Sequence, residues 1–219
     1  MEFRKRSNIK KFKNRQEAGQ RLAHALSSYE GKDVIVLGLP RGGVVLAAEI
    51  ARALKAPLDL IFAHKIGHPE REEYAIGAVS ESGHLITSPH LKIDPRWLEQ
   101  KKHSILAEIK RRRAFYLKGK ALPTFTDKTV IIVDDGIATG LTMQAAIQEV
   151  KNAHPKKLIV AIPLAPETTA RLIRSQVDAL IVIQEDPDYL FLGAVSAYYE
   201  EFKQVEDEEV IRLLEKSFK

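Results

Sequence analysis

The chain has 219 residues, which is enough for one domain with its own core and short for two. Its 45% hydrophobic and 29% charged residues argue against a disordered chain, and the lack of cysteine excludes disulfides, thiolate metal sites and cysteine nucleophiles. The net charge of +5 favours an anionic partner of unspecified kind, and it is unevenly spread, with 24 basic and 13 acidic residues in 1–120 against 10 and 16 in 121–219.

The predicted elements alternate between helices and strands along the chain. Capping signals and apolar spacing predict helices over 14–31, 44–56, 95–117, 142–153 and 166–175 and from Asp207 onward. Short apolar runs predict strands over 33–39, 58–65, 129–135, 157–165 and 178–184. This alternation predicts an α/β fold with a mostly parallel sheet, whose ligand site lies at the carboxyl ends of the strands.

Residues 66–84 interrupt this alternation. The segment contains three glycines, a proline and a run of charges, with little periodicity. We therefore expect a long loop, and a loop of this length inside a compact domain is usually functional or mobile.

The most informative stretch follows the third predicted strand. Asp134 and Asp135 stand at the strand end, then come the small residues of the 136–142 loop, and Thr142 opens a helix. Backbone N–H groups in such a turn, together with the helix N-terminus, suit a terminal phosphate, and adjacent carboxylates suit sugar hydroxyls. The stretch is neither a Walker loop, since Leu141 follows Gly140, nor a dinucleotide-binding loop.

The 130–142 stretch, VIIVDDGIATGLT, resembles the phosphoribosyl-pyrophosphate motif of the type I phosphoribosyltransferases. More narrowly, the chain resembles a little-characterised branch of that family with LPRGGV, KIG and VDDGIATG motifs. The resemblance implies a doubly wound, mostly parallel five-stranded sheet with flanking helices, a flexible flap and a small hood. It implies a single domain over 1–219, with a basic N-terminal arm at 1–13, the flap at 66–84 and the hood segment and last helix at 186–219.

The same resemblance implies roles for particular residues. Asp134 and Asp135 would be the catalytic acids that hold the ribose hydroxyls. The remaining substrate-binding residues would be Arg41, Gly42, Gly43 and Lys65 for the pyrophosphate and Gly136, Ile137, Ala138, Thr139, Gly140 and Thr142 for the 5-phosphate.

The implied activity is transfer of ribose 5-phosphate from phosphoribosyl pyrophosphate to a planar nitrogenous base, with release of pyrophosphate. Mg²⁺ would be the cofactor, held mainly by substrate oxygens and water rather than by protein ligands, and the chain would form a homo-oligomer. The alternative is a regulator on the same fold that binds phosphoribosyl pyrophosphate without catalysis, with RNA as a further ligand.

The sequence says less about the acceptor base than about the phosphoribosyl-pyrophosphate site. The hypoxanthine–guanine members carry an aspartate where this chain has Ala138, which argues against that acceptor. One interpretation is that Glu70, Glu72 or Glu73 in the flap acts as the general base for the reaction. The other is that all three are charges exposed to solvent. The hood aromatics Tyr189, Phe191 and Tyr198 either stack on a base or belong to the core or a dimer contact.

Two basic stretches remain. Residues 4–15 hold seven basic side chains and 110–113 read KRRR. Nucleic-acid binding is one interpretation, and a solvated arm and helix face is the favoured one, with Lys110 and Arg111 in solvent and Arg112 and Arg113 bordering the apolar face. No stretch approaches the roughly 20 apolar residues of a membrane span, and we expect a cytoplasmic protein.

Overall fold

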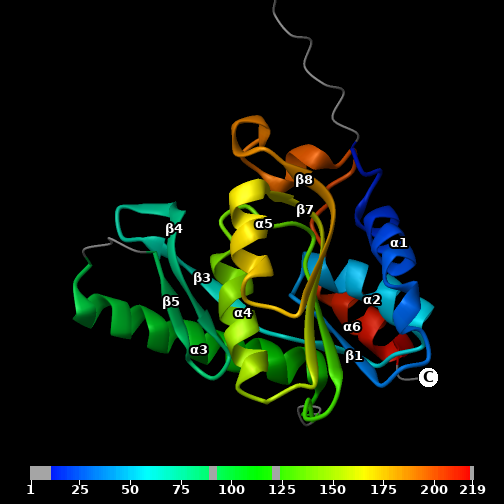
Figure 1. Cartoon of the computed structure of the whole chain (residues 1–219). Coiled ribbons are helices and arrows are strands. Elements are labelled where there is room, and N and C mark those ends of the chain that lie inside the picture. Colours follow the sequence, from blue (N-terminus) through cyan, green and yellow to red (C-terminus); the bar gives the residue numbers. More distant parts are fainter. Residues whose placement is uncertain (1–10, 89–92, 120–123, 218–219) are drawn as a thin grey trace, which may run out of the picture.

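The computed structural model describes residues 11–88, 93–119 and 124–217. Its main sheet has five parallel strands in the order β2-β1-β6-β7-β8 (Figure 1). The strands are β1 (Val34–Gly38), β2 (Leu58–Leu60), β6 (Thr129–Val133), β7 (Lys157–Pro166) and β8 (Ala179–Asp186). The predicted α/β fold with a parallel five-stranded sheet is therefore confirmed.

Helices cover both faces of this sheet (Figure 1). One face packs against α1 (Arg15–Ala25), α2 (Gly42–Leu54) and α6 (Asp207–Ser217), and the other against α4 (Leu141–Lys151) and α5 (Glu167–Arg174). Alternate residues of each strand face opposite layers: Val34 and Val36 join the first core, Ile35 and Leu37 the second. Burial on both faces explains why the strands read as unbroken apolar runs.

The strand order places the site. After β1 the chain moves to one side to form β2, and β6 then pairs on the other side of β1. The order therefore reverses between β1 and β6, and ligands of open α/β sheets bind in the crevice at such a point. The two strand ends are joined there, because the Leu39 N–H donates to the Val133 carbonyl at 3.0 Å.

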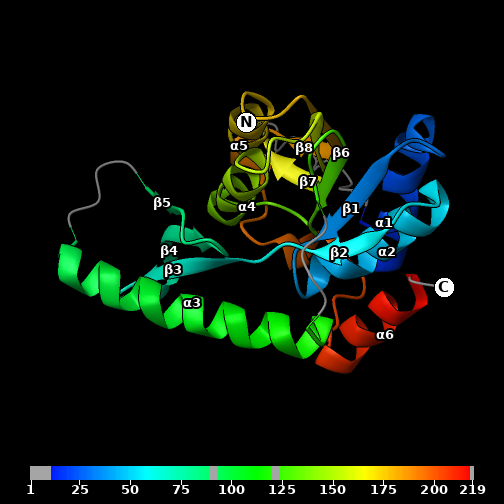
Figure 2. The same cartoon turned by 90° about the horizontal axis from the view of Figure 1, so that it is seen from below.

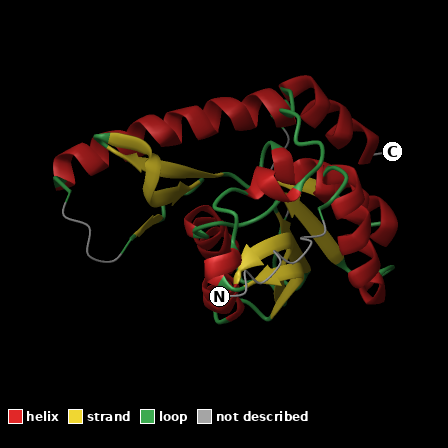
Figure 3. Cartoon of the chain, turned by 90° about the horizontal axis from the view of Figure 1, so that it is seen from above, coloured by secondary structure: helices red, strands yellow, loops and turns green. Residues whose placement is uncertain are grey.

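A second sheet replaces the loop expected over 66–84. It is antiparallel, in the order β3-β4-β5, with β3 (Ala63–His68), β4 (Arg71–Ser80) and β5 (Leu85–Thr87). It packs against α4 and the long helix α3 (Pro95–Leu117) (Figure 2 and Figure 3). The loop prediction was wrong because the segment pairs as a β-ladder of mixed polar and small apolar residues, such as Lys65 with Ala78, while the charged run lies at the exposed hairpin end. The predicted strand 58–65 is likewise split between β2 and β3.

The segments near the two chain ends meet beside the main sheet. Phe12 is fully buried and forms a parallel bridge with Tyr199. Three backbone hydrogen bonds hold the bridge: Phe12 N–H to Tyr198 O, Glu200 N–H to Phe12 O and Glu201 N–H to Lys13 O. Most of the basic arm, residues 1–10, lies outside the described residues.

The C-terminal segment continues through short turns η2 (Asp188–Leu190) and η3 (Val195–Tyr198) into α6, and η1 (Ser27–Tyr29) follows α1. Among the described residues, no helix combines the length and apolar character that crossing a membrane requires.

Candidate active site

The loop after β1 and the end of β6 are in direct contact. A methyl group built on Gly42 would lie 2.0 Å from Oδ2 of Asp135, and one on Gly43 would lie 2.6 Å from the Val133 carbonyl oxygen. Only residues without a Cβ allow this approach. The fold thus brings the 39–43 loop together with Asp134 and Asp135, as the sequence predicted. We call these two aspartates the acid pair.

Each carboxylate of the acid pair is held at one oxygen. Oδ1 of Asp134 accepts from the Asp135 backbone N–H at 2.8 Å, and Oδ2 of Asp135 accepts from Arg15 Nε at 2.7 Å. Within the described part of the chain, no hydrogen bond reaches Oδ2 of Asp134 or Oδ1 of Asp135. One oxygen of each carboxylate is therefore without a hydrogen-bond donor among the described residues.

Burial dominates the electrostatics of the acid pair. It raises the pKa of Asp134 well above its ordinary value, and the neighbouring Asp135 charge raises it further. Burial also raises the pKa of Asp135, and the Arg15 guanidinium opposes that rise. Tyr199 donates to the Asp135 carbonyl at 2.6 Å, and burial next to these charges raises the pKa of Tyr199, which keeps its hydroxyl a donor.

The 136–142 loop is shaped by two glycines. Gly136 has φ +149°, and a methyl group there would meet Val195 at 2.7 Å. Gly140 has φ +76° and caps α4 without a side-chain hydrogen bond. Among the described residues, no side chain caps α4, and helix N-termini left uncapped in this way can bind anionic oxygens through their first N–H groups.

Neighbouring elements brace this loop. The Ile137 N–H donates to the Leu164 carbonyl at 3.0 Å, and Thr169 Oγ1 donates to the Ala138 carbonyl at 2.8 Å. The Thr139 side chain is exposed, and that of Thr142 is half-buried at the first turn of α4. The loop thus presents backbone donors and hydroxyls next to the acid pair.

Arg41 and Lys65 occupy different settings. The Arg41 guanidinium forms ion pairs with Glu206 at 3.8 Å and with Asp207 at 3.4 Å, at the start of α6. Asp207 also accepts from the Tyr116 hydroxyl at 2.5 Å, so Arg41 is linked to α3. Lys65 lies not at the end of β2 but within β3, opposite Ala78, and is exposed.

The side chains considered for binding or activating the acceptor base differ in burial. Tyr198 is fully buried and donates to Asp186 at 2.7 Å, so it belongs to the core. Phe191 stacks on Tyr198 with ring centroids 5.4 Å apart, whereas Tyr189 is 85% exposed. Glu70 and Glu72 are exposed near the β3–β4 turn, and the side chain of Glu73 is outside the description.

The basic run on α3 is engaged within the chain. Glu108 forms ion pairs with Arg111 at 2.8 Å and Arg112 at 2.7 Å, and these hydrogen bonds lower the pKa of Glu108 to about 2. Arg113 pairs with Glu81 at 3.0 Å. Lys110 and Arg111 are exposed and Arg112 and Arg113 half-buried, which confirms the predicted helix faces.

Three residues around the site were not predicted: Arg15, Tyr199 and Asp207. Arg15 was one of seven basic residues in 4–15, and nothing in its spacing separated it from the others. The contact arises because α1 begins at the bridge to the C-terminal segment. Only the tertiary fold therefore identifies it.

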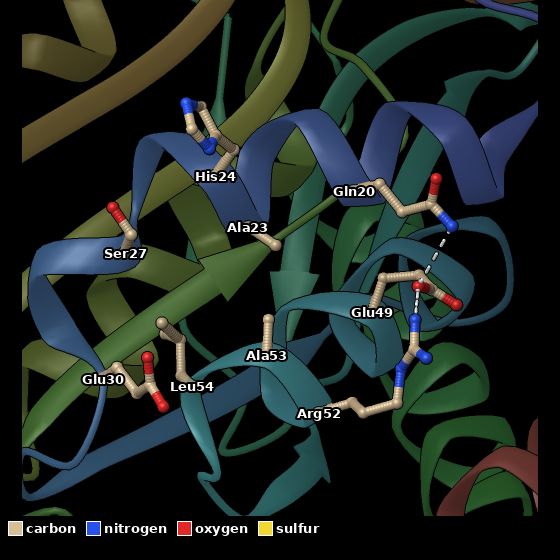
Figure 4. A pocket seen from close by; sticks show the side chains of 9 residues that line it. All are labelled: Gln20, Ala23, His24, Ser27, Glu30, Glu49, Arg52, Ala53 and Leu54. Atoms are coloured by element: carbon tan, nitrogen blue, oxygen red, sulfur yellow. Dashed lines mark hydrogen bonds and ion pairs between the residues drawn. The ribbon is translucent and has the colours of Figure 1, made fainter.

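Two other features do not form the site. Among the described residues, no group of three or more histidine, aspartate or glutamate side chains is placed to hold a metal ion. A hollow between α1 and α2 is lined by polar and apolar side chains, and three of them bond to one another, with Glu49 accepting from Gln20 and Arg52 (Figure 4). It contains none of the predicted site residues.

The model of the phosphoribosyl transferase domain family matches residues 5–200. A Mycobacterium tuberculosis protein named "Putative phosphoribosyl transferase" is 35% identical over 95% of this chain, which spans about half (47%) of that protein. Rat hypoxanthine-guanine phosphoribosyltransferase is 38% identical over 40% of this chain and 38% of its own length. The crystal structure of the Thermus thermophilus protein TT1426 is 34% identical, with a TM-score of 0.78 over 94% of this chain and 98% of that one.

The family model, which runs from residue 5 to residue 200, covers the 39–43 loop, the acid pair and the 136–142 loop. The chain belongs to the phosphoribosyl transferase family.

Proposed function

We propose that the chain transfers ribose 5-phosphate from phosphoribosyl pyrophosphate to a nitrogenous base and releases pyrophosphate. One observation carries this proposal: the 39–43 loop touches the acid pair at the strand-order reversal, beside a loop of backbone donors. The site therefore offers carboxylate acceptors for sugar hydroxyls between two regions suited to phosphate oxygens.

The proposed binding roles follow from the free groups. Oδ2 of Asp134 and Oδ1 of Asp135 accept hydrogen bonds from the ribose 2- and 3-hydroxyls. The 136–142 loop and the N-terminus of α4 hold the 5-phosphate. In this proposal the Arg41 guanidinium and the backbone of Gly42 and Gly43 bind the pyrophosphate, and Lys65, exposed on β3, is the second cation for it.

In the proposed reaction the bond from the ribose C1 to the pyrophosphate oxygen breaks and a bond from C1 to a base nitrogen forms. Negative charge develops on the leaving pyrophosphate while the ribose becomes cation-like, so positioning and electrostatics supply most of the rate enhancement. Arg41 stabilises the leaving charge. Mg²⁺ would be held mainly by substrate oxygens and water beside the carboxylates of the acid pair, and it would neutralise part of the pyrophosphate charge.

Two measurements test the proposal. Isothermal titration with phosphoribosyl pyrophosphate and Mg²⁺ should show binding that Asp135→Asn weakens. Absence of binding, or an unchanged Kd in Asp135→Asn, would contradict the donor site. A screen of nucleobases for pyrophosphate release then identifies the acceptor.

The screen also decides the second candidate, a regulator that binds phosphoribosyl pyrophosphate without turnover. Ala138 favours this candidate, because the position offers no side chain that can take a proton from the base. Binding without pyrophosphate release from any base would establish it. Pyrophosphate release with one base would exclude it.

A further inference from the structure

The Arg15 side chain is the feature of the site that the proposed roles leave unused. Among the residues that the structure describes, it is the one basic side chain that forms an ion pair with the acid pair, through Nε and Oδ2 of Asp135 at 2.7 Å. Both side chains are mostly buried, Arg15 with 12% and Asp135 with 15% exposed. An ion pair removed from solvent to this degree is both stronger and more orienting than a surface pair.

Two further contacts hold the guanidinium in place, and the backbone of Arg15 is fixed as well. Nη1 donates to the Lys203 carbonyl at 2.5 Å, and the guanidinium carbon lies 3.7 Å from the centroid of the Phe202 ring. Arg15 is the first residue of α1 and follows the bridge between Phe12 and Tyr199. The planar group is thus fixed on two sides and at its backbone, and the Asp135 carboxylate takes its direction from it.

The contact selects one oxygen of Asp135. Oδ2 is taken by Arg15 and lies against Gly42, while Oδ1 has no protein donor among the described residues. A half-turn of the carboxylate only exchanges its two equivalent oxygens, whereas any intermediate rotation would break the 2.7 Å contact. The groups that face Asp135 are Asp134, Arg15 and Tyr199, and of these Arg15 alone is a cation.

We propose that Arg15 is a positioning residue that holds the Asp135 carboxylate in the orientation that receives a ribose hydroxyl. This inference rests on the proposed function and adds a residue from outside both phosphate-binding loops. It requires that substitution of Arg15 change the affinity for ligands that carry the ribose and leave the affinity for free pyrophosphate unchanged.

The test compares two probes on the full chain, phosphoribosyl pyrophosphate and inorganic pyrophosphate, both with Mg²⁺ in isothermal titration. Arg15→Met should raise the Kd for phosphoribosyl pyrophosphate about tenfold or more, as expected for loss of a charge-assisted hydrogen bond. It should change the Kd for pyrophosphate less than about twofold. Arg15→Lys should restore part of the loss. Where Arg15→Met does not fold, Arg15→Gln, which keeps a donor, takes its place.

Arg21→Met is the matched control. Arg21 also lies on α1, pairs with Glu17 at 3.7 Å and stacks on a ring, that of Phe12, at 4.7 Å. It should leave both Kd values unchanged.

If Arg15→Met lowers the affinity for both probes equally, Arg15 has a merely structural role and the inference is overturned. An unchanged affinity for both probes would also overturn it. Failure of the unsubstituted chain to bind phosphoribosyl pyrophosphate would overturn the proposed function first, before any variant is compared.

Discussion

Replacing Gly43 with alanine tests whether the close approach of the 39–43 loop to β6 builds the site. The added methyl carbon would lie 2.6 Å from the Val133 carbonyl oxygen and 2.9 Å from the Asp134 Cα. Both obstacles are backbone atoms, so no side-chain rotation relieves them. The loop and the strand end must separate by about 0.8 Å before the methyl group reaches ordinary contact at 3.4 Å.

The magnitude follows from two opposing terms. Overpacking of this kind costs about 1–3 kcal/mol, and alanine in place of glycine returns up to about 1 kcal/mol of helix propensity in α2. With the full helix-propensity return, we expect the free energy of unfolding to fall by about 0–2 kcal/mol. A displacement near 1 Å at a reacting centre costs about a hundredfold in rate, so activity should suffer far more than stability.

Urea denaturation followed by circular dichroism gives the stability, and pyrophosphate release gives the activity. Ala53→Gly, at an exposed position of the same helix, measures the propensity term alone. In Gly42→Ala the methyl group meets the Asp135 carboxylate and the Arg15 Nε instead, so that variant should lose ribose binding with little change in stability. A Gly43→Ala variant with unchanged stability and activity would refute the reasoning.

Asp207→Asn should tighten pyrophosphate binding by up to about fivefold, because an exposed ion pair that competes for Arg41 is worth about 0–1 kcal/mol; isothermal titration measures this. Glu149→Gln should flatten the dependence of stability on acid pH. Burial raises the pKa of Glu149, but the hydroxyl and amide donors together outweigh it and lower the pKa below its ordinary value. The stabilisation from Glu149 is therefore complete above the unfolded-state pKa and lost as pH falls through the folded-state pKa. Urea midpoints at several pH values measure this loss. Tyr198→Phe should cost about 1–3 kcal/mol of stability, because the Asp186 carboxylate loses a donor.

Each of these has a contrary result. Weaker pyrophosphate binding in Asp207→Asn would mean that the acid assists the site rather than competing with it. A Glu149→Gln variant whose midpoint falls with acid as steeply as that of the unsubstituted chain would remove the linkage argument. An unchanged midpoint in Tyr198→Phe would show that water replaces the tyrosine hydroxyl.

Much of the fold was predictable because its signals are local. The strands of the main sheet are buried on both faces, so each is a short apolar run that stands out in the sequence. Helix α3 was predicted over its observed range from its helical pattern, and the structure shows that Asp94 caps it and Pro95 opens it. The 130–142 motif predicted the acid pair and the phosphate-type loop for the same reason, as both lie in one continuous stretch.

The remainder depends on contacts between distant segments. The second sheet escaped prediction because its strands are stabilised by packing on α3 and α4, as where Glu149 of α4 accepts from Ser80 at 2.6 Å. Arg41 was predicted correctly as a loop residue, but its pairing with Asp207 joins residues 166 positions apart. Tyr198 could be read as core or as a stacking group from sequence, and only its burial decides.

The bridge between Phe12 and Tyr199 also sets the order in which the site is completed during synthesis. Arg15 and its anchor at Lys203 are 188 positions apart, so the acid pair leaves the ribosome well before the segment that fixes its cation. At about 5–20 residues per second, translation takes roughly 3–14 s to pass from Asp135 to Lys203. A nascent chain that stalls in this interval can hold β1 paired with β6 and still lack an oriented Asp135, so folding of the sheet and competence of the site are separate events.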